Sequence, residues 1–211
     1  MHLIVGLGNP GRRYERTRHN VGFLAVGELA VRWQIDPRGR DNFGALLGDG
    51  LVAGQRAVLV QPQGFMNASG QPVATAAGFY KVKPADIVVL HDDMDLPFGA
   101  LRCKRGGGHG GHNGLRDLSR VLGPEYTRVR FGVGRPPTGW DPADYVLGKW
   151  STAEEQELPA LLSLAADAIE TILREGIDAA SNRFNARPDR PGGPPEVPPV
   201  AASAEALRSR R

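Results

Sequence analysis

Short apolar runs that alternate with longer amphipathic segments limit the folds available to this chain. Strands are predicted at residues 2–6, 43–48, 56–61, 87–90, 100–105 and 127–133. Helices are predicted at residues 20–33, 67–81, 113–122, 153–175 and 177–184. Alternating strands and helices are typical of three-layer α/β folds, and a hairpin at 43–61 makes the sheet mixed. We therefore expect one three-layer α/β globule around a mixed, mostly parallel central sheet.

The composition changes near residue 187, where proline, glycine, alanine and arginine begin to dominate. Such a segment buries too little apolar surface to offset the entropy lost on ordering. The chain has 211 residues, which suits one domain with an appendage. We expect a catalytic domain at residues 1–186 and a disordered tail at residues 187–211.

Cysteine content and hydropathy indicate the compartment. Cys103 is the one cysteine of the sequence, so no internal disulfide can form, which favours a reducing environment. The first six residues lack the basic start of a signal peptide. No apolar run reaches the roughly 18 residues that span a membrane. We expect a cytoplasmic protein without a membrane partner.

Positive charge is concentrated in two segments. Residues 98–135 hold eight basic and two acidic side chains, a net charge of +6, while the whole chain carries +3. A smaller cluster, residues 12–18, holds four arginines and one glutamate. Such a local excess indicates a polyanionic partner, or else a solvated basic face. Charge alone leaves both interpretations open.

Two stretches match the pattern G-x-G-x-x-G, at residues 6–11 and 106–111. A dinucleotide site also needs a helix that opens at the motif and an acidic residue about 20 positions later, and neither stretch has both. Neither stretch ends in Gly-Lys-Ser/Thr, so neither is a P-loop. The glycines at 106–111 instead allow close approach of backbone amides to a phosphate or a peptide carbonyl. A flexible surface turn is the alternative.

His19 stands at the entrance of the first predicted helix, and Asp92 directly follows the buried strand at 87–90. Ligands of open α/β sheets bind beyond the carboxyl ends of the strands. An aspartate there can accept the Nδ1–H of an imidazole and leave Nε2 free to deprotonate water. Alone, His19 is better explained as a polar residue at a helix entrance; a carboxylate beside it would instead indicate a general base.

The acidic and histidine residues at 91–95, with His109 and His112, also suggest a metal site. Carboxylates bind hard cations such as Mg²⁺. However, Asp92 and Asp93 point to opposite sides of an extended segment, and His109 and His112 lie on a glycine-rich loop. We therefore expect neither a metal nor a cofactor.

Asn9, Asn67 and Asn113 lie at predicted junctions between elements. Each is explained locally as a turn or helix-capping residue. Together they could form an uncharged clamp, since amides donate to a carbonyl and accept from water.

These motifs, taken in order, closely resemble the bacterial peptidyl-tRNA hydrolases. The resemblance covers about residues 2–185 and rests on residues 6–11, Tyr14, 17–20, 65–67, 91–97 and 106–114, with weaker matches at 145–149 and 182–184. It implies a monomeric α/β hydrolase that cleaves the ester between a peptide and the tRNA 3′ ribose. Its partner would be the acceptor stem and 3′ end of peptidyl-tRNA, and its role the recycling of tRNA from prematurely dissociated translation products.

The resemblance also implies roles for individual residues. His19 resembles the general base of the family, and Asp92 the carboxylate that orients it. Residues that would hold the water and the substrate are Asn9, Tyr14, Asn20, Met66, Asn67, Met94, His112 and Asn113. Lys104 and Arg130 resemble the clamp on the tRNA 5′-phosphate. No metal is implied.

The segment at 135–141 departs from the family pattern, because it lacks a lysine that some members carry, and Arg135 is a candidate substitute. Our hypothesis is direct attack by water that His19 activates, with no nucleophilic serine or cysteine and with Cys103 structural. The alternatives are a non-catalytic RNA-binding relative and a metal-dependent hydrolase.

Overall fold

The computed structural model describes residues 1–37 and 40–185, so the expected tail at 187–211 lies outside the described residues. The strands are β1 (His2–Gly6), β2 (Arg40–Asn42), β3 (Ala45–Val52), β4 (Gln55–Pro62), β5 (Ile87–Asp93), β6 (Leu101–Arg105) and β7 (Thr127–Gly132). The α-helices are α1 (Val21–Trp33), α2 (Gly70–Tyr80), α3 (Asn113–Leu122), α4 (Pro142–Leu147), α5 (Thr152–Glu175) and α6 (Ile177–Asn185). The 3₁₀ turns whose bounds lie within the described residues are η1 (Arg18–Asn20), η3 (Met66–Ala68) and η4 (Pro84–Asp86).

All seven described strands form one sheet in the order β2-β3-β4-β1-β5-β7-β6. The four central strands β4, β1, β5 and β7 are parallel, whereas β3 and β6 run antiparallel to their neighbours. Because β2 is antiparallel to β3, it shares the direction of the central four. The expectation of a mixed, mostly parallel sheet is confirmed. The carboxyl ends of four parallel strands thus meet along one edge.

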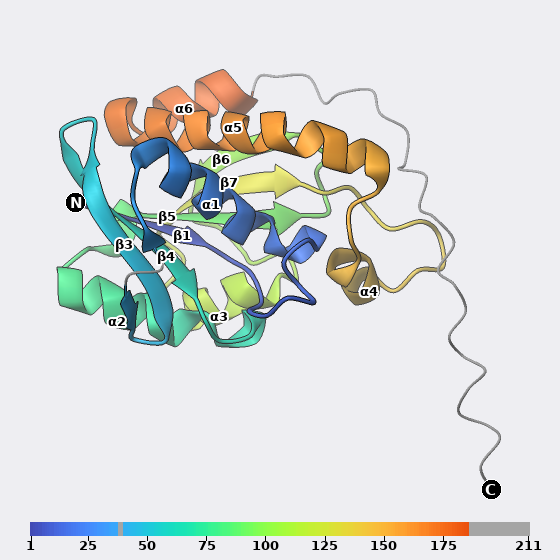
Figure 1. Cartoon of the computed structure of the whole chain (residues 1–211), viewed down its shortest axis with the longest axis horizontal. Helices are drawn as coiled ribbons and strands as arrows, with labels where there is room; N and C mark the ends of the chain where they lie inside the picture. Colours follow the sequence, from blue (N-terminus) through green and yellow to red (C-terminus); the bar gives the residue numbers. More distant parts are fainter. Residues whose placement is uncertain (38–39, 186–211) are drawn as a thin grey trace, which may run out of the picture.

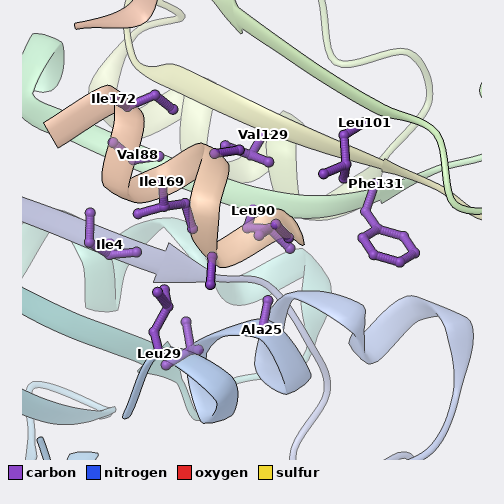
Figure 2. Close-up of a cluster of buried hydrophobic side chains, with 14 of the residues drawn as sticks. Ile4, Ala25, Leu29, Val88, Leu90, Leu101, Val129, Phe131, Ile169 and Ile172 are labelled. Carbon is purple, nitrogen blue, oxygen red and sulfur yellow. The ribbon is translucent and has the colours of Figure 1, made fainter. Parts of the chain in front are cut away.

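Helices cover both faces of this sheet, which gives the expected three layers (Figure 1). Helices α1, α5 and α6 lie on one face and α2 and α3 on the other. The period-two alternation of β1 explains this, because Ile4 packs toward α1 and α5 while Leu3 and Val5 pack toward α2 and α3. Figure 2 shows the first of these cores, where Ile4, Val88, Leu90 and Val129 of the sheet meet Ala25, Leu29, Ile169 and Ile172 of the helices.

Close backbone contact places α1 against the end of β1. A Cβ atom added at Gly22 would lie 2.4 Å from the backbone nitrogen of Leu7, and one at Gly6 would lie 2.2 Å from the carbonyl oxygen of Gly22. Only glycine fits at either position. As a result, η1, which directly precedes α1, is held at the carboxyl edge of the sheet.

Two elements, β2 and α4, were not expected from the sequence. Strand β2 has three residues and meets β3 through a turn at Phe43 and Gly44, which both have positive φ. Helix α4 has six residues, too few for an apolar period to be visible. The helix expected at 67–81 is interrupted: η3 ends at Ala68 and α2 begins at Gly70.

Among the described residues, no helix is both long enough and apolar enough to cross a membrane.

Candidate active site

A cavity of about 530 Å³ opens at the carboxyl edge of the sheet. Its volume falls within the range of small-ligand sites. Among its lining residues are Asn9 after β1, His19 of η1, Asn67 of η3, Asp92 of β5, and His112 with Asn113 at the start of α3. Segments far apart in the sequence therefore converge where ligands of α/β sheets bind.

Asp92 lies between two histidines at the base of this cavity. The Nδ1 atom of His19 is 2.8 Å from Asp92 Oδ1, and the Nε2 atom of His112 is 3.0 Å from the same oxygen. The Asp92 side chain is 3% exposed and that of His19 is 12% exposed. Because an ionised carboxylate only accepts, each histidine donates its proton to Asp92. The contact expected between His19 Nδ1 and Asp92 is present, and Nε2 of His19 is left unprotonated in the neutral ring.

Asp92 also sets the charge state of this group. Burial favours the neutral form of His19, but the negative charge of Asp92 and its hydrogen bond outweigh this and raise the pKa of His19 above 6.5. Burial alone would raise the pKa of Asp92; the two histidines overcome that effect and hold this pKa well below its ordinary value. Asp92 therefore stays ionised beside an imidazole that can gain and lose a proton.

The amides of α3 fix the tautomer of His112. Its Nδ1 atom accepts from the backbone N–H groups of Gly114, at 3.1 Å, and of Leu115, at 3.3 Å. Nδ1 must therefore carry the lone pair, and the proton must lie on Nε2, where it is donated to Asp92. His112, not Asn113, is the N-cap of α3.

This tautomer bears on the metal alternative. His19, Asp92 and His112 place potential ligand atoms within 4.8 Å of one another. A metal at His112 Nε2 would displace the proton from that atom and move it to Nδ1, where two backbone N–H groups already point. The donor set therefore fits a hydrogen-bonded triad better than a metal centre.

His91, which sequence reasoning placed only among candidate ligands, lies against this triad. Its Nδ1 atom donates to the backbone oxygen of Asp92 at 2.7 Å, and its ring contacts that of His112 at 5.1 Å between centroids. Burial, and then the neighbouring His112, lower the pKa of His91 to about 3. His91 is therefore a neutral part of the cavity wall.

The side chain of Asn9 is fixed so that its amino group is available. Its Oδ1 atom accepts from the backbone N–H of Met66 at 2.7 Å, which assigns the other end of the amide as Nδ2. Asn9 lines the cavity although it is only 7% exposed. It can therefore donate a hydrogen bond to an oxygen bound there.

Asn20 lies behind Asn9 and not in the cavity wall. Its Oδ1 accepts from the backbone N–H of Asn9, and its Nδ2 donates to the backbone oxygen of Asn9, both at 2.9 Å. It is 1% exposed, and it makes no side-chain cap for α1. The expected direct contact with substrate is therefore corrected: both polar atoms of Asn20 are occupied in holding Asn9.

The other two asparagines are exposed at the mouth of the cavity. Asn67 makes no side-chain hydrogen bond to any residue that the structure describes, and Asn113 accepts one from Arg116 at 3.0 Å. Met66 and Met94 also line the cavity. Tyr14 does not: it packs edge-on against Phe65 at 6.3 Å, and Phe65, 59% exposed, lies at the rim.

Basic side chains line the part of the cavity that faces β6 and β7. Lys104 pairs in register with Arg128, so their side chains share a face with that of Arg130. Arg130 donates through Nε to Asp93 at 2.7 Å, and no residue in the described part of the chain bonds to its terminal nitrogens, which can therefore contact another anion. Burial, then the charges of Arg128 and Arg130, lower the pKa of Lys104. Arg135 pairs with Asp95 at 2.5 Å and does not line the cavity.

One further wall is apolar and comes from α4 through Pro142, Ala143, Val146 and Leu147. Sequence reasoning missed this wall, although Asp141 followed by Pro142 is a recognisable helix start. Cys103 lies outside the cavity, and burial raises its pKa to about 12. The described residues that line the cavity include no serine, threonine or cysteine.

Comparisons with known proteins identify relatives of this chain. The family model described as "Peptidyl-tRNA hydrolase" matches residues 3–191. The peptidyl-tRNA hydrolase of Nocardia farcinica is 50% identical over 184 residues, which cover 87% of this chain and 95% of that protein. That of Roseiflexus is 48% identical over 193 residues, which cover 90% and 88%. The crystal structure of peptidyl-tRNA hydrolase from Acinetobacter baumannii has a TM-score of 0.83 at 38% identity and covers 88% of this chain and 95% of its own.

Proposed function

The chain belongs to the peptidyl-tRNA hydrolase family and releases tRNA from peptidyl-tRNA as an ester hydrolase, and we propose that water activated by His19 carries out the cleavage. The observation that supports this mechanism is the 2.8 Å contact between His19 Nδ1 and Asp92, which leaves Nε2 as a base. The absence of a hydroxyl or thiol side chain among the described lining residues favours direct attack by water.

In the first step, Nε2 of His19 takes a proton from water as the water oxygen attacks the ester carbonyl. Asp92 stabilises the imidazolium that forms. In the second step, the tetrahedral intermediate collapses, the bond from the acyl carbon to the ribose oxygen breaks, and the imidazolium returns its proton to that oxygen. General-base catalysis of this kind contributes about 10²–10⁴ in rate.

The amides of Asn9, Asn67 and Asn113 are proposed to stabilise the oxyanion and position the water. All three line the cavity, and the Nδ2 atom of Asn9 is oriented by Met66. Uncharged donors serve this purpose without shifting the protonation of His19. A single donor to an oxyanion is typically worth about 10²–10³ in kcat.

Lys104 and Arg130 are proposed to bind a tRNA phosphate on the side of the cavity formed by β6 and β7. Their charges and the free terminal nitrogens of Arg130 suit a bidentate phosphate contact. Such contacts place the substrate without reading its sequence. The apolar wall of α4 suits side chains of the peptide.

We also propose that residues 1–186 act as one monomeric, cytoplasmic catalytic domain that recycles tRNA from prematurely dissociated translation products. The continuous sheet and the two cores that flank it support a single domain.

The test of the mechanism is the His19→Ala variant, assayed for release of free peptide from peptidyl-tRNA. We expect kcat to fall about 10²–10⁴-fold while the affinity for tRNA stays near that of the wild type. His2→Ala serves as the control, because His2 contacts Gln55 and does not line the cavity. Near-normal kcat in His19→Ala would contradict the assignment.

Two further outcomes distinguish the alternatives. A wild-type protein that binds tRNA but releases no peptide would indicate a non-catalytic relative. If EDTA abolishes the activity and a divalent ion restores it, the protein would be a metal-dependent hydrolase.

A further inference from the structure

Arg128 is a buried cation with an unusual set of partners. It lies on β7 and is 2% exposed. One terminal nitrogen donates to the backbone oxygen of Gly108 at 2.6 Å, and the other donates to the backbone oxygen of Gly107. Its guanidinium lies over the ring of Tyr126 at 4.8 Å, and among the described residues its Nε has no hydrogen-bond partner and its charge has no acidic partner. A buried charge is costly unless hydrogen bonds compensate it, so these two carbonyl contacts dominate its interactions.

The carbonyls belong to the glycine-rich loop, residues 106–111, which links β6 to α3. Few other bonds hold this loop. Gly106 donates to Tyr126 at one end, and His109 bonds with Gly111 and His112 at the other. Between these ends, Arg128 supplies the described side-chain hydrogen bonds to the main chain. The loop is also closed against Lys104, because a Cβ added at Gly107, whose φ is +96°, would lie 2.5 Å from Lys104 Nζ.

The loop leads directly into the catalytic end of the cavity. Its next residue, His112, both caps α3 and donates to Asp92, and Asn113 follows at the cavity mouth. A displacement of the loop would therefore move both residues relative to His19. Misplacement of reacting groups by about 1 Å can cost roughly 100-fold in rate.

We propose that Arg128 is a positioning residue, which holds the glycine-rich loop in the shape that places His112 and Asn113 for catalysis. Arg128 lines the same cavity as Lys104 and Arg130, but its side chain is 2% exposed and each terminal nitrogen donates to a carbonyl, so we assign it to the loop and not to a phosphate. The inference rests on the proposed function, since turnover takes place in the same cavity.

The test is the Arg128→Lys variant, which keeps the positive charge but replaces a planar fork by a single ammonium group. One ammonium cannot reproduce two divergent guanidinium bonds to successive carbonyls. We expect kcat on peptidyl-tRNA to fall about 10- to 100-fold and KM to change less than about twofold. The matched control is Arg120→Lys, whose parent side chain lies exposed on α3 and pairs with Asp117. It should retain the wild-type kcat.

Amide hydrogen exchange provides a readout that does not depend on activity. In Arg128→Lys, the amides of residues 106–112 should exchange faster, while those of β5 and α1 should remain as protected as in the wild type. This measurement still tests the inference if the wild-type protein fails to cleave peptidyl-tRNA, which would instead contradict the proposed function.

Three results would overturn the inference. Unchanged kcat and unchanged exchange would show that the loop does not depend on Arg128. A rise in KM alone would make Arg128 a contributor to tRNA binding. Faster exchange throughout the sheet, with a matching fall in melting temperature, would reduce Arg128 to a general stabilising residue.

Discussion

Asp92 accepts hydrogen bonds from two imidazoles at a single carboxylate oxygen, and this shared contact sets the pH range of the reaction. His19 must be neutral to remove a proton from water. The charge and hydrogen bond of Asp92 raise the pKa of His19, although burial opposes that effect. Protonated His19 is therefore retained to a higher pH than in a free histidine, so kcat should fall as the pH drops through this raised pKa.

We predict that Asp92→Asn moves the acidic limb of the pH–rate profile to lower pH. Removal of the carboxylate leaves the burial of His19, which lowers its pKa, without the opposing charge. The same change should reduce the maximal kcat by roughly 10²–10⁴-fold, because the imidazolium loses its stabilising partner. The measurement is kcat against pH for both proteins with peptidyl-tRNA.

If the acidic limb of the Asp92→Asn profile stays at the wild-type pH, the fall in kcat at low pH does not come from protonation of His19, and the assignment of His19 as the base is contradicted. Asp167→Asn is the control, because Asp167 pairs with Arg32 and does not line the cavity. Its profile should overlap that of the wild type.

The pairing of His19 with Asp92 could be predicted from the sequence because the place of each residue in its predicted element puts it at the same edge of the sheet. One residue precedes a helix and the other ends a buried strand of a parallel sheet. The contacts of Asn20 and Arg128 could not be predicted in this way. Each depends on which loop closes over which face, and that is decided by tertiary packing and not by local pattern.

At the scale of elements, a buried ion pair joins η1 to the start of α5. Arg18 donates to Glu154 at 2.7 Å and to the backbone oxygen of Lys149 at 2.7 Å, and both charged side chains are 3% exposed. The guanidinium also stacks on Tyr145 at 4.5 Å. Because His19 follows Arg18, this pair anchors the turn that carries the proposed base.

We predict that Glu154→Gln lowers the free energy of unfolding by about 3–5 kcal/mol, because it leaves the Arg18 charge buried without a carboxylate partner. Glutamine can still complete the capping box with Ser151, so the substitution removes the negative charge but keeps the helix cap. Chemical denaturation followed by circular dichroism provides the measurement.

The neighbouring residue offers a matched control. Glu155 pairs with Arg16 at 3.1 Å on the surface, where the two side chains are 36% and 64% exposed. Exposed pairs contribute about 0–1 kcal/mol, so Glu155→Gln should have little effect. Equal losses in both variants would contradict a special role for the buried pair.

The elements themselves were largely predictable, and the exceptions share a cause. Strand β5 and helix α5 lie close to their expected positions because a continuous apolar run and a long amphipathic period are strong signals. Helix α4 and strand β2 are short, so their formation depends on neighbours that the local pattern does not reveal. The α4 wall of the cavity was missed for this reason.

At the scale of the whole molecule, the fold places the basic side chains of residues 98–135, whose net charge is +6, in different environments. Arg128, Lys104 and Arg130 all line the cavity, but Arg128 is buried and is proposed to hold a loop, while Arg120 and Arg135 pair with acids on the surface. A segment that resembles one basic face in the sequence thus offers a localised phosphate site in the folded protein.

We predict that Lys104 and Arg130 each account for about one phosphate contact in the binding of tRNA. Displacement of counterions makes log K fall linearly with log salt, with a slope of about −0.9 for each phosphate neutralised on a duplex. Lys104→Gln and Arg130→Gln, each in a His19→Ala background that prevents turnover, should therefore make the slope shallower by roughly one. The measurement is the Kd of peptidyl-tRNA across a series of salt concentrations. Arg56→Gln is the control, since Arg56 is an exposed residue of β4 that pairs with Asp49 and lies outside the cavity. An equal change of slope in that control would show that tRNA binding follows net charge and not the site formed by β6 and β7.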